Sequence, residues 1–426
     1  MKKTIAIIII VFLILLGGIG YYLYLNNGNQ SISSGKIFNN VKNFFPFGDP
    51  STQTEPVTQN DTNTPTQNTN IQPIKIDRMF QISNVPTAGY ISIDTISTSS
   101  EIFFNKEKNA TTSTTTKQTE TFVRFVERAT GHILESKISN LEKNRILNTT
   151  IPKIYESYLN SKGSEFITRT LSGENIVTEY RKIEFGTSTT IGNIVSTINY
   201  PSNTDIFITK GDTVFYTTKT SFGSVGYLSN FDNKKPIQIF STPLREIGAS
   251  WSGGNIIEIF SKPNSQYDGI SFVVDIKNKT IKESLSGILG LTTNISTDGA
   301  YSLYNTNIEK LTLGAKVKNT NTAIYLTTST LPEKCVWSKK NTKIIYCAVP
   351  RYFTKIGYPE KWYQGQISFN DDFWSINIET GEQNLIYRPT ADEKQSPDAI
   401  NLNLNDKENY LFFIDKKDLT LWGLSI

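Results

Sequence analysis

Residues 249–282 show a pattern of hydrophobic and polar positions that returns along much of the chain. Apolar stretches at 256–260 and 270–276 are separated by polar turns, and Trp251 ends an earlier stretch just before Ser-Gly-Gly-Asn. Apolar runs of about five residues between Gly, Asn and Ser are typical of short antiparallel strands. One such unit cannot bury both of its faces, so its recurrence predicts small sheets stacked around a common axis.

The pattern recurs about seven times between residues 74 and 426, with the spacing of roughly 40 to 50 residues that is typical of propeller blades. It predicts an all-β fold, a β-propeller of about seven four-stranded blades. The last unit lacks a fourth strand of its own. We expect residues 74–82 or 90–96 to complete it, because closing the ring removes two unpaired edges. The Thr- and Ser-rich residues 110–119 are expected to form an exposed loop, and no helix is expected within 74–426.

Five segments carry a resemblance to a known class of repeats: WSGGNIIEIF, ISTDGAYSLY, VWSKKNTKIIYCA, LNDKENYLFFI and DDFWSINIETGEQNLIY. An aromatic strand end, a Ser-containing turn and an apolar strand are similar to the repeats of TolB-like and WD40-like β-propellers. The resemblance covers residues 74–426 and is strongest from Ala249 onward. The classical combination of Gly-His with a later Trp-Asp is absent, which disfavours the intracellular WD40 subtype. Propellers host many unrelated roles, so the resemblance implies a fold and no particular activity.

The N-terminal segment has the composition of a membrane-spanning helix. Lys2 and Lys3 precede the apolar residues 5–25, a run long enough to cross a bilayer. We therefore expect residues 1–25 to be a transmembrane signal anchor in the cytoplasmic membrane. The two lysines would keep the N-terminus inside and leave the rest of the chain outside. The alternative is a signal peptide that is cleaved, which would make the protein secreted.

Residues 26–73 are rich in Asn, Thr, Gln and Pro and are expected to form a disordered linker, because they lack the apolar content needed for a core. Residues 36–47 interrupt this composition. They are either a short amphipathic helix on the membrane surface or a more apolar part of the disordered linker. The β-propeller domain is expected to occupy residues 74–426.

Charge and motifs exclude several function classes. The formal net charge of +4 comes without a dense Lys/Arg run beyond the N-terminus, which argues against a nucleic-acid partner. No cofactor or metal motif is found. His132 is the only histidine, and we expect it to be exposed in a turn rather than catalytic. Glycoside hydrolysis needs only two carboxylates. Asp298, Asp371 and Asp372 are the visible candidates, at positions where a blade needs turn-forming residues.

Cys335 and Cys347 flank a predicted hairpin. They could form a disulfide across two antiparallel strands, or remain two buried thiols; the register of the hairpin decides between these outcomes. The following tryptophans lie in strand patterns and are expected in the core: Trp251, Trp337, Trp374 and Trp422.

Residues 349–369 interrupt a blade and form the candidate interaction loop. They are rich in the residue types that are enriched at binding hot spots. The candidate contact residues are Arg351, Tyr352, Phe353, Tyr358, Trp362 and Tyr363. The alternative is that these aromatic side chains fold back and cap the end of the propeller.

Together these features predict a non-catalytic, extracytoplasmic, membrane-anchored β-propeller that acts as a protein-binding or assembly scaffold in the cell envelope. The expected partners are the membrane, through the N-terminal helix, and an envelope protein. One alternative is a carbohydrate-binding or carbohydrate-active propeller, with a glycan held by carboxylates in the axial pocket. Another is a structural subunit of a larger surface machine.

Overall fold

The computed structural model describes residues 77–105, 110–186, 191–307, 311–320, 322–353, 358–389 and 396–426, with backbone alone for 99–105, 110–116, 306 and 307. The predicted anchor (1–25), linker (26–73) and amphipathic segment (36–47) lie outside these residues. Among the described residues no helix has the length and apolar character needed to span a bilayer.

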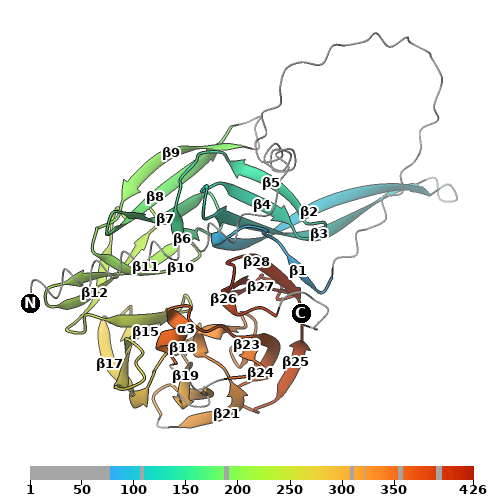
Figure 1. Cartoon of the computed structure of the whole chain (residues 1–426). Helices are drawn as coiled ribbons and strands as arrows, with labels where there is room; N and C mark the ends of the chain where they lie inside the picture. Colours follow the sequence, from blue (N-terminus) through green and yellow to red (C-terminus); the bar gives the residue numbers. More distant parts are fainter. Residues whose placement is uncertain are drawn as a thin grey trace, which may run out of the picture. The chain divides into compact units, whose positions relative to one another are not determined.

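The described chain is all-β, with small antiparallel sheets in a propeller-like arrangement (Figure 1). Five sheets have four strands each. The first two of them comprise β10 (Thr204–Lys210), β11 (Thr213–Thr220), β12 (Gly223–Asn230) and β13 (Ile237–Thr242), then β14 (Ile247–Trp251), β15 (Ile256–Ser261), β16 (Asp268–Asp275) and β17 (Thr280–Leu289). The next two comprise β18 (Thr293–Ile295), β19 (Tyr301–Asn307), β20 (Thr312–Val317) and β21 (Ala323–Ser329), then β22 (Cys335–Trp337), β23 (Ile344–Pro350), β24 (Asp371–Asn377) and β25 (Gln383–Tyr387).

The fifth four-stranded sheet joins the two ends of the described chain. Its order is β1 (Met79–Gln81), β28 (Leu421–Ser425), β27 (Tyr410–Asp415) and β26 (Ala399–Leu404). Met79 pairs with Leu424 in the antiparallel ladder between β1 and β28. The predicted completion of the last unit by residues 74–82 is therefore confirmed, and residues 90–96 lie in another sheet.

The remaining strands form one eight-stranded sheet. Its strands are β2 (Thr87–Asn105), β3 (Ala110–Glu127), β4 (Ile133–Lys137), β5 (Glu142–Leu147), β6 (Ile154–Leu159), β7 (Glu165–Ser172), β8 (Asn175–Phe185) and β9 (Gly192–Asn199). Strands β2–β5 and β6–β9 are two antiparallel halves, joined by the parallel pair Leu147 and Gly192. Five sheets are thus separate four-stranded blades, fewer than the seven or so expected, because two predicted units join edge to edge.

One predicted loop is wrong. Residues 110–119 belong to β3, which pairs with β2 from Asn105–Ala110 back to Thr87–Glu127. Threonine has a high strand propensity, so a polar Thr-rich run can form a strand when it has a partner. The ends of β2 and β3 project away from the other strands (Figure 1).

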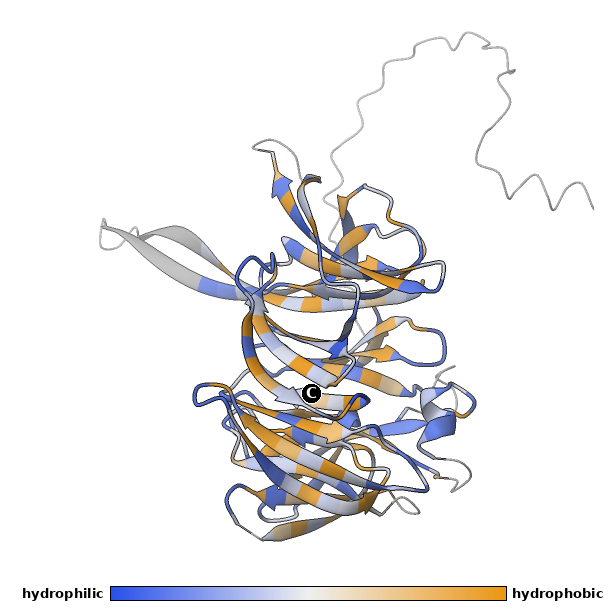
Figure 2. Ribbon diagram, turned by 90° about the vertical axis from the view of Figure 1, so that its left-hand side faces the viewer, coloured by the Kyte–Doolittle hydropathy of each residue, from blue (hydrophilic) through white to orange (hydrophobic). Residues whose placement is uncertain are grey.

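Hydrophobic clusters lie between neighbouring sheets and hold them together. The first strands of successive units contact one another: β2 with β6, β6 with β10, β10 with β14, β14 with β18, and β22 with β26. Orange and blue segments follow one another along the strands in Figure 2, because successive residues of a pleated strand point to opposite faces of the sheet. Trp251 and Trp337 are buried, and Trp374 and Trp422 are partly buried against these clusters, in agreement with their predicted core positions.

Cys335 and Cys347 are direct partners in the β22–β23 ladder, with their Cα atoms 4.1 Å apart. The structure joins them in a disulfide bond. The hairpin register therefore brings the two sulfur atoms together within a single sheet.

Candidate functional site

The candidate interaction loop lies between β23 and β24, as the sequence predicts, and we call its described residues 351–353 and 358–370 the insertion. It contains the single-turn helix α3 (Glu360–Tyr363). Just before β22 the chain forms the short 3-10 helix η2 (Pro332–Lys334). Contacts between these two short helices and β26 form the candidate site.

The six candidate contact residues divide into inward and outward side chains. Tyr358 and Trp362 are buried, at 2% and 3% exposed, and Phe353 packs beside them. The cluster is completed by Leu311, Leu331 and Phe369. Tyr352 is 83% exposed and Tyr363 is 44% exposed. Part of the candidate loop therefore folds back into a core, and the two tyrosines remain available at its surface.

Arg351 has a local partner. Its Nε donates a hydrogen bond to Asp372 Oδ1 at 2.6 Å. Arg388 approaches the other oxygen of the same carboxylate, with Nε 2.8 Å from Oδ2. Asp372 thus pairs with two guanidinium groups at the base of the insertion, and its contact with Arg351 fixes the start of the insertion there.

Hydrogen bonds attach α3 to three other parts of the chain. Trp362 Nε1 donates to Asp398 Oδ2 at 2.9 Å, and Lys416 Nζ donates to the Trp362 carbonyl oxygen at 2.6 Å. Glu360 Oε1 accepts from the backbone N–H of Ser265 at 2.8 Å and from its hydroxyl at 3.0 Å. Ser265 belongs to the loop between β15 and β16, so α3 bridges separate sheets. Tyr267 in that same loop is 71% exposed.

A fully buried lysine lies beneath the insertion. Lys334 Nζ is 2.8 Å from Asp371 Oδ2 and 2.6 Å from Asp398 Oδ1, and none of the three side chains is exposed. Lys334 also donates to the Ala399 carbonyl oxygen at 3.0 Å. The ring of Trp362 is centred 5.5 Å from the ammonium. These contacts tie η2, β24, β26 and α3 together through one charge.

The electrostatics of this cluster favour a charged lysine. Burial alone would lower the pKa of Lys334, but Asp371 and Asp398 more than reverse that effect and the pKa is raised. Burial raises the pKa of Asp371 to about 6; Lys334 opposes this shift and Asp398 adds to it. Asp371 Oδ1 and Asp415 Oδ2 have no hydrogen-bond partner within the described part of the chain.

The arrangement is suited to holding structure together rather than to acid–base chemistry. A glycosidase needs two carboxylates that flank a bound sugar. Here both carboxylates of the pair are enclosed and bind the same ammonium. Asp372 binds two arginines, and Asp298 Oδ1 accepts from the Ser296 hydroxyl and the Ala300 N–H within its turn.

The single histidine is more enclosed than the sequence suggests. The side chain of His132 is only 15% exposed, with Nδ1 3.8 Å from Glu127 Oε2 and Nε2 3.4 Å from Thr150 Oγ1. The prediction of a solvent-exposed turn histidine is therefore wrong. The segment before β6 covers the turn: Ile151 N–H donates to the Thr130 carbonyl oxygen.

Glu333 lies beside the lysine cluster and was not a candidate from sequence. Its carboxylate accepts the Tyr363 hydroxyl, at 2.7 and 3.0 Å from the two oxygens. Burial raises the pKa of Glu333 to about 7, while Tyr363, Lys334 and Lys416 act in the opposite direction. The hydrogen bond between Tyr363 and Glu333 therefore joins α3 to η2 through a carboxyl group that titrates near neutral pH.

Replacing Glu333 with glutamine is expected to change how stability depends on pH. Between the ordinary glutamate pKa of 4.5 and about 7, the folded protein keeps a proton that the unfolded chain releases. The contribution of Glu333 to the free energy of unfolding therefore falls as pH rises through this range. Urea unfolding of wild type and Glu333→Gln from pH 4.5 to 8 measures the difference. Equal slopes in the two proteins would contradict the assignment.

No family model matches the chain, and no curated protein matches it. Among solved structures, a functionally unknown protein from Desulfotomaculum acetoxidans DSM 771 is similar, with 17% identity, a TM-score of 0.43 and coverage of 72% of this chain and 89% of that one.

Two enzymes with similar parts are also found. The tricorn protease matches with 11% identity and a TM-score of 0.34, over 68% of this chain and 27% of the protease. An oligogalacturonate lyase in complex with manganese matches with 11% identity and a TM-score of 0.34, over 72% of this chain and 74% of the lyase. Likenesses at these scores carry no argument about activity, and no family, TolB-like or WD40-like, is assigned by them.

Proposed function

We propose that this protein is a non-catalytic binding scaffold: an extracytoplasmic β-propeller, anchored in the cytoplasmic membrane by residues 1–25, that holds a partner protein of the cell envelope. Counting the two halves of the eight-stranded sheet separately, the propeller would have seven blades, with repeats similar to TolB-like and WD40-like ones. The N-terminal apolar run and the polar residues after it support the anchor and the tether.

The observation that carries this proposal is the two-sided insertion. Its inward side is fixed by Trp362 and by the hydrogen bonds of α3, and its outward side presents Tyr352 and Tyr363. A tyrosine on a fixed base offers a large amphipathic contact area and loses little conformational entropy on binding. Tyr267, in the adjoining loop, adds a third exposed ring.

The alternative is a carbohydrate-binding or carbohydrate-active propeller that uses axial carboxylates. It needs at least two carboxylates open to a ligand. Asp371 and Asp398 are enclosed and paired with Lys334, which lends that alternative no support. A structural subunit of a larger assembly would instead need a broad apolar patch on one face and a partner that co-purifies stably with the protein.

The proposal is tested by recovering partners of the full-length protein from its own membranes after mild crosslinking. Tyr352→Ala is expected to reduce the recovered partner at least about tenfold, the effect of losing one aromatic hot spot. Tyr325→Ala is the matched control, because Tyr325 is a 71% exposed tyrosine on β21, in another sheet. Equal recovery with both variants, or equal loss, would overturn the assignment of the contact to the insertion.

A further inference from the structure

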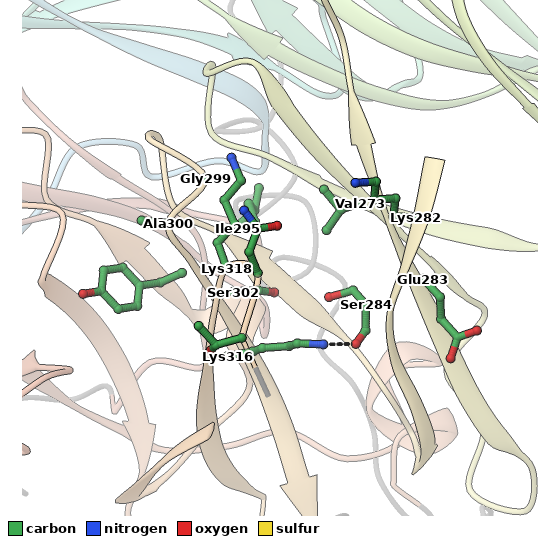
Figure 3. Close-up of a pocket in the computed structure, with 13 residues that line it drawn as sticks. Val273, Lys282, Glu283, Ser284, Ile295, Gly299, Ala300, Ser302, Lys316 and Lys318 are labelled. Carbon is green, nitrogen blue, oxygen red and sulfur yellow. Dashed lines mark hydrogen bonds between the residues drawn. The ribbon is translucent and has the colours of Figure 1, made fainter. Parts of the chain in front are cut away.

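A groove of about 350 Å³ lies between the sheet β14–β17 and the sheet β18–β21 (Figure 3). This volume is at the lower end of the range for small-molecule sites. The side chains that matter below are Lys282, Ser284, Tyr301, Ser302, Lys316 and Lys318. They come from both walls, so the groove exists only because the two sheets pack side by side.

Strand register explains why polar groups face each other here. Lys316 is paired with Ser302 in the ladder between β19 and β20, so both side chains lie on the same side of that sheet. Lys316 Nζ reaches across the groove to the Ser284 carbonyl oxygen on β17, as Figure 3 shows. The Ser302 hydroxyl donates to Glu258 on β15. These two contacts link the walls at the floor of the groove.

Within the described ranges, the lysines of the groove have no acidic partners. Lys282, Lys316 and Lys318 form no ion pair with any residue in the described ranges. Glu283 is the one acidic residue among the described residues that line the groove, and its Oε1 accepts from the Ser286 hydroxyl. Three ammonium groups against one carboxylate give this concave surface a positive potential.

Hydrogen-bonding capacity also remains unused in the groove. An ammonium group has three donors, and the Ser284 carbonyl oxygen accepts one of those of Lys316. Asn319 adds a side-chain amide at the rim, whereas the hydroxyl of Thr320 already donates to the Val317 carbonyl oxygen and that of Ser284 already binds Glu258. Glu258, below the floor, is fully buried, and burial raises its pKa, which weakens the negative charge that it could place under the site.

We propose that this groove binds a small acidic sugar, whose carboxylate or phosphate group lies against Lys316 and the two flanking lysines. Lysines bind such groups as point charges and do not require the planar geometry that arginine selects. The Asn319 amide and the remaining ammonium donors of the lysines suit the hydroxyls of a sugar. This site is separate from the insertion, and the inference does not rest on the proposed protein contact.

The test is calorimetric titration of the full-length protein with four probes: glucuronate, glucose 6-phosphate, glucose and inorganic phosphate. We expect one or both acidic sugars to bind, glucose not to bind, and inorganic phosphate to bind more weakly than the phosphorylated sugar. Raising the salt concentration should weaken the binding, since exposed charges are screened. Comparison of glucuronate with glucose 6-phosphate tells which anionic group is preferred.

Variants connect the binding to the groove. Lys316→Met is expected to weaken it at least about tenfold, the loss of one charge-assisted hydrogen bond. Lys282→Gln is the second variant, because the side chain of this exposed lysine forms no hydrogen bond or ion pair with any described residue, so the fold should tolerate the change. Lys277→Gln, an exposed lysine on the turn between β16 and β17 outside the groove, is the control and should bind like wild type.

Three results would overturn the inference. They are no binding of either acidic sugar, equal affinity for inorganic phosphate and glucose 6-phosphate without binding of glucuronate, and binding that Lys316→Met and Lys282→Gln leave unchanged. Loss of binding in Lys277→Gln to the same degree would also count against it, because a general charge effect would then explain the result.

Discussion

Replacing Lys334 with methionine is expected to lower the free energy of unfolding by about 3–5 kcal/mol, the usual cost of removing one partner from a buried ion pair. The substitution leaves Asp371 and Asp398 facing each other in a site where neither carboxylate is exposed. It also removes the contacts that join η2 to β24 and β26. Urea unfolding followed by tryptophan fluorescence measures the change.

Two companion variants distinguish the effect of the buried Lys334 ion pairs on stability from the effect of removing a surface charge. Lys339→Met removes an exposed lysine, paired with an exposed Asp406, and should change stability by less than about 0.5 kcal/mol. Asp371→Asn should cost less than Lys334→Met, because Asp398 still neutralises the ammonium. A loss in Lys334→Met no larger than that in Lys339→Met would show that the buried pair does not hold the insertion.

Replacing Trp362 with alanine is expected to lower the free energy of unfolding by about 3–5 kcal/mol, as for other buried aromatic residues. The ring is 3% exposed and packs on Phe369 at 5.9 Å between ring centres. The substitution also removes the Nε1–H donor, so Asp398 Oδ2 loses one hydrogen bond. Thermal unfolding of the two proteins measures the loss.

Tyr352→Ala is the matched comparison for Trp362→Ala, since both substitutions remove an aromatic ring from the insertion. Tyr352 is 83% exposed, so its loss should change stability by less than about 0.5 kcal/mol. Equal destabilisation by the two substitutions would contradict the division of the insertion into an inward and an outward side.

The fold could be predicted from sequence because its signals are local. Short apolar strands and polar turns, repeated along the chain, indicated the propeller-like sheets. The missing last strand indicated closure by residues 74–82 or 90–96, and β1, in the first of these ranges, provides it. Residues 110–119 were misassigned because their polar composition resembles that of a loop. What makes them a strand is pairing with β2, which composition does not reveal.

The candidate site was predictable in location and only partly in detail. Its content of aromatic residues and arginine indicated that the insertion is a candidate interaction loop. Which of these side chains are buried, like Trp362, and which exposed, like Tyr352, depends on partners distant in sequence such as Leu331. The pairing of Lys334 with Asp398 spans 64 positions and has no local signal. The groove is likewise built from two sheets, and no stretch of sequence contains its charge pattern.

The central claim is that a partner protein covers the outward side of the insertion, and hydrogen–deuterium exchange tests it most directly. The full-length protein is compared alone and with the partner recovered from its membranes. We predict slower exchange in the insertion (residues 351–353 and 358–370) when the partner is bound, and unchanged exchange in β21. Unchanged exchange in the insertion, with protection elsewhere on the propeller, would contradict the account.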